Sequence, residues 1–111
     1  MSDDDFYLKE THLKEQEDQL ETEKRQLLRD KENYISLSND TKRFLEDLFQ
    51  EFRLSSNRYK FSQAIEEQVT VSKLVVGYFE KQEEVLRTEH LRLENEQQIL
   101  REKQRKENLT K

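Results

Sequence analysis

Apolar side chains recur every seven residues along the first half of the chain. The series runs through Leu13, Leu20, Leu27, Tyr34 and Leu48, and Thr41 is its one polar interruption. A repeat of seven keeps one face of a helix directed at the same neighbour, as in a left-handed coiled coil. The pattern therefore predicts a long amphipathic helix over about residues 5–54.

The second half of the chain carries a series with the same period. It runs through Ile65, Ser72, Phe79, Leu86, Leu93 and Leu100. This series predicts a second long helix over about residues 60–108, again with a single narrow apolar seam.

The two series are mirror images, because paired positions have residue numbers that add up to 113. The pairs are Leu13 with Leu100, Leu20 with Leu93, Leu27 with Leu86, Tyr34 with Phe79, Thr41 with Ser72 and Leu48 with Ile65. Flanking positions follow the same rule, pairing Leu37 with Val76, Phe44 with Val69 and Phe52 with Phe61. A single unbroken helix has no need for such a mirror, whereas a chain folded back on itself does.

The fold class predicted is therefore all-α, a long antiparallel two-helix coiled-coil hairpin formed by residues 1–111 as one domain. Ser and Asn favour turns and helix caps, so we place the turn at about residues 55–59, around Ser56-Asn57. We expect the hairpin seam to consist of Leu13, Leu20, Leu27, Tyr34, Phe44, Leu48, Phe52, Ile65, Val69, Phe79, Leu86, Leu93 and Leu100.

The middle of the predicted hairpin has more apolar residues than one seam can use. A large exposed apolar patch usually marks an interaction site. The residues expected to contact a partner are Ile35, Leu45, Phe49, Val71, Leu74, Tyr78 and Val85. Either another protein's helices or a second hairpin, in a four-helix bundle, would cover them. The outer zone, roughly residues 8–33 and 80–107, by contrast alternates one apolar residue with Gln, Glu or Asp, and we expect its tips to pack weakly and fray unless a partner covers them.

Composition narrows the function. Charged residues make up 41% of the chain and hydrophobic ones 32%, with no proline and one glycine, which suits long solvated helices. The formal net charge is −5, which disfavours nucleic-acid binding. There is no signal-peptide pattern at the N-terminus and no apolar run long enough to span a bilayer, so we expect a cytoplasmic protein without membrane insertion.

No pattern in the chain indicates catalysis. The only histidines are His12 and His90, which the mirror does not pair, and no cysteine is present. Glycine-rich phosphate loops, nucleophile motifs and zinc-ligand spacings are absent from the sequence. We therefore expect no enzyme activity, no catalytic residues, no cofactor and no metal. Gly77 lies off the seam, and it either merely weakens the helix or admits a closely packed partner helix.

The chain resembles the small α-helical accessory proteins encoded beside LXG toxins of Gram-positive type VIIb (ESX-like) secretion systems. The resemblance covers nearly the whole chain. It rests on Leu-spaced charged flanks such as Leu13-Lys-Glu-Gln-Glu-Asp-Gln-Leu20, and on the aromatic centre Phe44-Leu-Glu-Asp-Leu-Phe-Gln-Glu-Phe52. Charged heptads from Leu86 to Leu100 complete it.

This resemblance implies a chaperone or targeting role. Such proteins bind the helical N-terminal region of an LXG toxin, often beside a second small helical protein, and permit its export. The chain has no Trp-x-Gly turn and no Tyr-x-x-x-Asp/Glu signal, since Gln82 follows Tyr78 at that spacing. These departures favour an accessory role and leave open whether the protein is exported with its partner. The alternative is a self-associating structural coiled coil unrelated to secretion.

Overall fold

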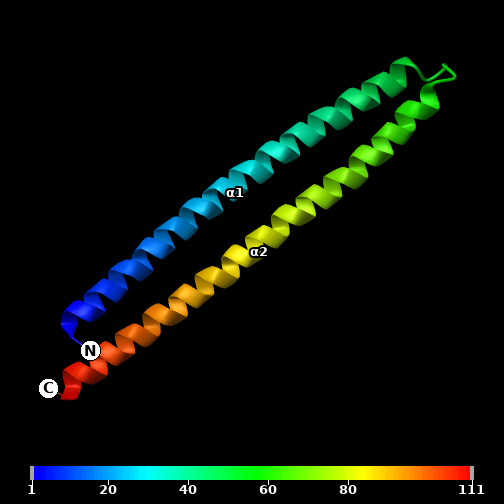
Figure 1. The fold of residues 1–111 in the computed structure, drawn as a ribbon. Coiled ribbons are helices and arrows are strands. Elements are labelled where there is room, and N and C mark those ends of the chain that lie inside the picture. The colour runs from blue at the N-terminus through cyan, green and yellow to red at the C-terminus, as the bar shows by residue number, and fades with distance from the viewer. Residues whose placement is uncertain (1, 111) are drawn as a thin grey trace. The chain divides into compact units, whose positions relative to one another are not determined.

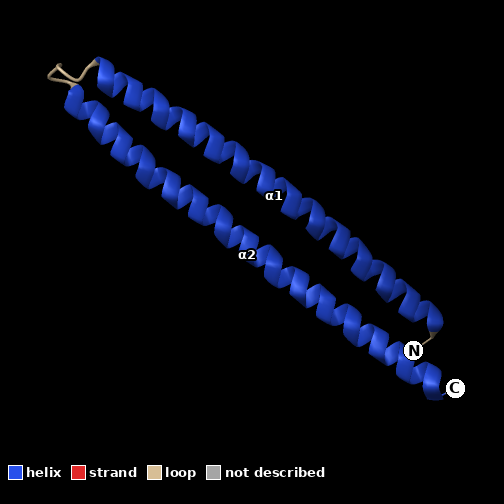
Figure 2. Ribbon diagram, turned by 180° about the vertical axis from the view of Figure 1, so that it is seen from behind, coloured by secondary structure: helices blue, strands red, loops and turns tan. Residues whose placement is uncertain are grey.

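The computed structural model describes residues 2–110 and consists of two long helices joined by one turn (Figure 1). Helix α1 spans Asp3–Glu51 and helix α2 spans Arg58–Thr110, with the turn over residues 52–57. Figure 2 shows that the only loop between the helices is this turn. The all-α helical hairpin predicted from the sequence is confirmed. Compared with the predicted bounds of 5–54 and 60–108, both helices begin earlier and α1 ends earlier.

Helix α1 begins at a reciprocal cap formed by Ser2 and Asp5. The Asp5 backbone N–H donates to Ser2 Oγ at 3.2 Å, and the Ser2 backbone N donates to Asp5 Oδ2 at 3.2 Å. The Ser2 hydroxyl also donates to Asp5 Oδ2 at 2.9 Å. Such a capping box satisfies backbone donors that the first helical turn leaves without partners. The acidic run Asp3–Asp5 also suits the positive end of the helix dipole.

The turn is built without glycine, proline or a left-handed residue. Its backbone bonds are Ser55 N–H to Phe52 O at 2.9 Å and Arg58 N–H to Ser55 O at 3.2 Å. The Ser55 hydroxyl accepts a bond from the Asn57 backbone N–H at 3.1 Å. Throughout residues 2–110 no positive φ occurs. Short polar side chains therefore take the role that glycine usually has at a helix end.

The helix pair divides into two compact units, each of which contains an antiparallel part of α1 and α2. Unit 1 combines residues 2–26 with 83–110, and unit 2 comprises residues 27–82 with the turn.

Unit 1 has a narrow, well-covered apolar core. Leu13, Leu20 and Leu93 are buried and form one cluster, against which Leu86 and Leu100 pack. Phe6, on the same heptad series, is only 1% exposed. Long polar side chains cover this core from the sides, since Gln97 Nε2 donates to Glu17 Oε2 across the two helices at 3.0 Å. Their methylene stems shield leucine while their polar ends reach water.

The strongest burial of the chain therefore lies where we expected weak packing. Among the described residues, the buried hydrophobic side chains are Phe6, Leu13, Leu20 and Leu93, and all belong to unit 1. Counting apolar partners alone underestimates this burial, because the methylene groups of Gln and Glu side chains also cover the leucines.

Unit 2 places aromatic side chains from the two helices together. The rings of Tyr34 and Phe79 lie 6.2 Å apart, and those of Phe52 and Phe61 stack at 5.3 Å. Both are pairs that the mirror predicted, so its register holds in this unit. Leu27, Leu48, Ile65 and Val69 are half-buried here.

Candidate helix-docking face

The orientation of α1 in unit 2 differs from the expected one. Phe44 was expected in the seam, yet its side chain is 62% exposed, and Leu37, expected opposite Val76, is 63% exposed. Starting from Tyr34, the heptad alternates steps of three and four residues. From Tyr34 and Thr41, a step of three residues leads to Leu37 and Phe44, whereas a step of four leads to Ser38 and Leu45. The structure turns the residues reached by the step of four toward α2.

This orientation draws other apolar residues toward α2. Ile35, Leu45 and Phe49, which we expected to contact a partner, are half-buried within the unit. Three large apolar side chains thus gain cover in place of two, which favours the observed rotation of α1.

The rotation also changes the polar layer predicted between Thr41 and Ser72. Thr41 is exposed, and its hydroxyl donates to the Leu37 carbonyl of its own helix at 2.9 Å. Ser38 takes its place, with 8% exposure, and donates to Ser72 Oγ at 2.8 Å. Gln68 Nε2 donates to Ser38 O at 2.9 Å and to Ser38 Oγ at 2.7 Å.

A buried polar layer of this kind ties the two helices at one register. Its hydrogen bonds are geometrically specific, so a shifted pairing would leave buried polar groups without partners. Within this polar layer, Gln68 Oε1 is buried and accepts no hydrogen bond.

On α2, all four residues expected to contact a partner lie on the surface. Val71 is 53%, Leu74 71% and Tyr78 60% exposed in unit 2, and Val85 is 58% exposed in unit 1. Val71, Leu74 and Tyr78 are three or four residues apart, so they are neighbours on the helix surface.

We infer from heptad offsets that the exposed residues of α1 lie on the same side of unit 2 as those of α2. An open groove in unit 1, of about 550 Å³, shows which heptad offsets share a side. On α1 its walls include Lys9 and Gln16, each of which stands three residues after a seam position, Phe6 or Leu13. On α2 they include Arg92 and Ile99, each of which stands one residue before a seam position, Leu93 or Leu100. In unit 2 these offsets correspond to Leu37 and Phe44, and to Val71 and Tyr78.

We call the set Leu37, Phe44, Val71, Leu74 and Tyr78 the apolar face of unit 2. Its side chains are 53% to 71% exposed, although each is large and apolar. Several large apolar side chains exposed on neighbouring helix positions are uncommon on a monomer and are typical of an interaction surface. Val71, Leu74 and Tyr78 were predicted partner residues, whereas Phe44 was predicted in the seam.

Charged residues border the apolar face unequally. Asp40 and Asp47 are exposed and stand within four residues of Phe44 on α1. Glu67 and Lys81 are exposed beside the α2 part. The α1 border is thus acidic and the α2 border is mixed.

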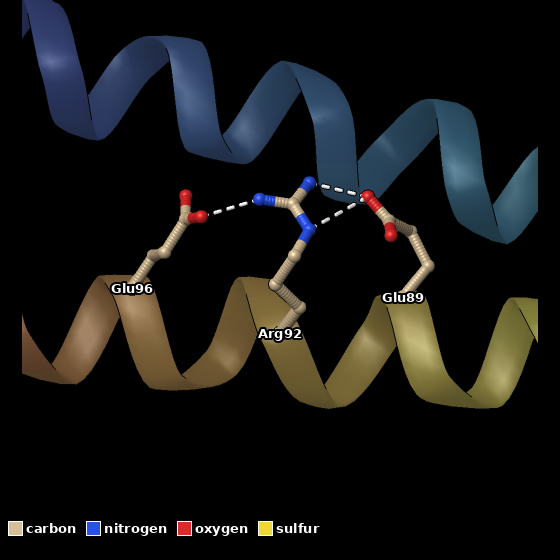
Figure 3. Close-up of polar contacts among 3 residues, drawn as sticks. All are labelled: Glu89, Arg92 and Glu96. Carbon is tan, nitrogen blue, oxygen red and sulfur yellow. Dashed lines mark hydrogen bonds and ion pairs between the residues drawn. The ribbon is translucent and has the colours of Figure 1, made fainter.

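The groove of unit 1 has an apolar floor and a charged rim. Leu13 and Leu100 lie at its floor, and Lys9, His12 and Lys103 contribute basic groups to its lining. Arg92 also lines it, and Figure 3 shows its guanidinium between Glu89 and Glu96 on α2. These carboxylates raise the pKa of Arg92, and its hydrogen bonds lower the pKa of Glu89. This triad is exposed and acts mainly as intrahelical pairing.

The two histidines have different surroundings within unit 1. His90 Nε2 lies 2.9 Å from Glu94 Oε1 on its own helix, while His12 lines the groove.

Within residues 2–110, no group of three His, Asp or Glu side chains is arranged to hold a metal ion. Across the same residues, neither helix is long and apolar enough to cross a membrane. Gly77 has open space where a Cβ would stand, so no neighbour within the structure requires glycine there.

No protein-family model, curated protein or solved structure matches this chain significantly.

Proposed function

We propose that this protein is a non-enzymatic adaptor that binds a helical segment of another protein on the apolar face of unit 2. The observation that carries the proposal is the exposure of two large aromatic side chains of unit 2, Phe44 at 62% and Tyr78 at 60%. Two antiparallel helices offer a groove between them into which a third apolar stripe packs, as in helical bundles.

The partner that we propose is the helical N-terminal region of an LXG toxin, which the adaptor would target for type VIIb secretion. The support is the resemblance of the Leu-spaced charged flanks and the aromatic centre to accessory proteins of that system. A second small helical accessory protein would cover part of the same face. We place the adaptor in the cytoplasm, where it would meet the toxin before export, and leave its own co-export to experiment.

The borders of the apolar face suggest how a partner helix lies. Asp40 and Asp47 on α1 are exposed, so a partner with basic residues beside α1 gains favourable pairing. Such rim charges mainly affect orientation and association rate.

Co-expression with an LXG toxin encoded beside this gene tests the proposal. The N-terminal region of the toxin should co-purify with the native adaptor, and Phe44→Lys with Tyr78→Lys should abolish co-purification. Leu54→Lys is the matched control, because Leu54 is 91% exposed but lies in the turn outside the apolar face. Loss of toxin export after deletion of this gene is expected. A gene neighbourhood without any LXG toxin, or intact export after deletion, would contradict the secretion role.

A second candidate function is self-association as a structural coiled-coil protein. The same apolar face favours it, because two hairpins could bury their faces against each other as a four-helix bundle. Light scattering on the purified protein separates the two functions. A dimer that Phe44→Lys dissociates, and that no toxin region displaces, would favour the structural role.

A further inference from the structure

The mirror in the seam has a consequence beyond the hairpin. Every contact that α1 makes with α2 of its own chain could equally be made with α2 of a second copy. The stacked pair Phe52 and Phe61, 5.3 Å apart, and the pair Tyr34 and Phe79 would be preserved in such an exchange. So would the hydrogen bond between Ser38 and Ser72.

The turn presents little obstacle to exchange. Residues 52–57 read Phe-Arg-Leu-Ser-Ser-Asn, and none of them is glycine or proline. No described residue has a positive φ, so no residue of the turn would have to leave a left-handed conformation to become helical. All six residue types are tolerated inside helices. The turn is held by a few short-range bonds, such as Asn57 N–H to Ser55 Oγ.

Straightening the turn would also place two apolar groups that the hairpin exposes at one level of the exchanged pair. Leu54 is 91% and Tyr59 77% exposed. Their residue numbers again add up to 113, so in an exchanged pair Leu54 of one copy reaches the level of Tyr59 of the other.

We propose that the partner fitted by the inner faces of α1 and α2 is a second copy of this chain, in an exchanged dimer with residues 52–57 helical. Exchange of an identical element is a low-cost route to a dimer, because the interface already exists in the monomer. The hairpin is favoured at low concentration, since its two helices are tethered. The proportion of dimer then depends on the helix propensity of the turn.

A cysteine pair distinguishes the exchanged dimer from two hairpins packed side by side. The native chain has no cysteine, so Ser38→Cys with Ser72→Cys introduces the only thiols, at hydroxyl positions now 2.8 Å apart. After refolding at high concentration and oxidation, a non-reducing gel should show covalent dimers; refolding at low concentration should give monomers. Hairpins packed side by side would give internally bridged monomers at both concentrations, which would overturn the proposal. Ser36→Cys with Gln63→Cys, both exposed, measures collisional cross-linking.

Turn variants in the otherwise native chain provide the second measurement. Ser56→Ala with Asn57→Ala should raise the dimerisation constant, and Ser56→Gly with Asn57→Gly should lower it. Each dimer contains two straightened turns, so we expect the two variants to differ by roughly a hundredfold or more. Size-exclusion chromatography with light scattering measures both. Equal dimer fractions in the two variants would contradict the exchange even if the cysteine variant failed to fold.

Discussion

At the scale of single residues, Ser38 shows why burial does not follow hydrophobicity alone. It is the buried polar residue of the described chain, and its hydroxyl contacts both Ser72 and Gln68. From the sequence, Thr41 was the natural candidate for this layer, because it continues the heptad series. The positions of Ser72 and Gln68 around Ser38 make its burial favourable, and no periodicity reveals that arrangement.

Ser38→Ala should destabilise the protein by about 1–2 kcal/mol, because it leaves the half-buried polar groups of Ser72 and Gln68 with fewer partners. Replacing all three residues together, as Ser38→Ala, Gln68→Leu and Ser72→Ala, should be neutral or stabilising, since no polar group then remains buried. Urea unfolding followed by circular dichroism measures both. A single variant as stable as the native protein would show that the layer contributes nothing.

The Asp5 cap predicts a pH dependence at the start of α1. Hydrogen bonds from Ser2 lower the pKa of Asp5. The pKa of Asp5 is therefore lower in the folded chain than in the unfolded chain, where it has the ordinary Asp value of about 3.9. The cap stabilises the helix fully at a pH above that ordinary value, and its contribution is lost as the pH falls through the folded-state pKa. Amide exchange of the first turn of α1 should therefore accelerate relative to intrinsic rates below about pH 3.9. Ser2→Ala should weaken that dependence, because it removes the hydroxyl bond to Asp5 and leaves the backbone bond; an unchanged profile in this variant would contradict the role of the Ser2 hydroxyl in the cap.

At the scale of the helices, the sequence was sufficient for the number, order and pairing of the elements. The mirror pairs Tyr34 with Phe79 and Phe52 with Phe61 are in ring contact. The rotation of α1 was not predictable in the same way, since Leu37 and Phe44 are as apolar as Ile35, Leu45 and Phe49. The choice between them depends on the summed cover in unit 2 and on the satisfaction of Ser38.

The rotation of α1 can be tested by comparing two phenylalanines. Phe49 is half-buried and Phe44 is 62% exposed. Phe49→Ala should cost roughly 2 kcal/mol of unfolding free energy, and Phe44→Ala well under about 1 kcal/mol, because the cost follows the buried area lost. Thermal unfolding of the two variants measures the difference. A larger loss of unfolding free energy for Phe44→Ala than for Phe49→Ala would show that Phe44 lies in the seam.

At the scale of the whole molecule, the two units have opposite characters. Unit 1 contains the buried cluster Leu13, Leu20 and Leu93, while unit 2 exposes its apolar face. A protein that binds through one unit needs the other to hold its helices together without a partner, and leucines covered by Gln and Glu stems suit that role.

Leu93→Ala should destabilise the protein by about 2–4 kcal/mol, because Leu93 is 2% exposed and a cavity would remain. Hydrogen exchange should show protection falling first in residues 7–25 and 84–105. Val85→Ala, at a position 58% exposed in the same unit, is the control and should change little. Equal losses of protection in the two variants would mean that the leucine cluster is not the core of unit 1.

The central claim is that the apolar face of unit 2 contacts a helical protein partner. Photo-cross-linking tests it most directly, with a photoreactive phenylalanine analogue placed in turn at Phe44, Tyr78 and the exposed Arg43 during co-expression with the N-terminal region of an LXG toxin. We expect cross-links to the toxin region from the analogue at positions 44 and 78 and none from the analogue at position 43. Cross-links from Arg43 alone, or from no position while the complex forms, would contradict it.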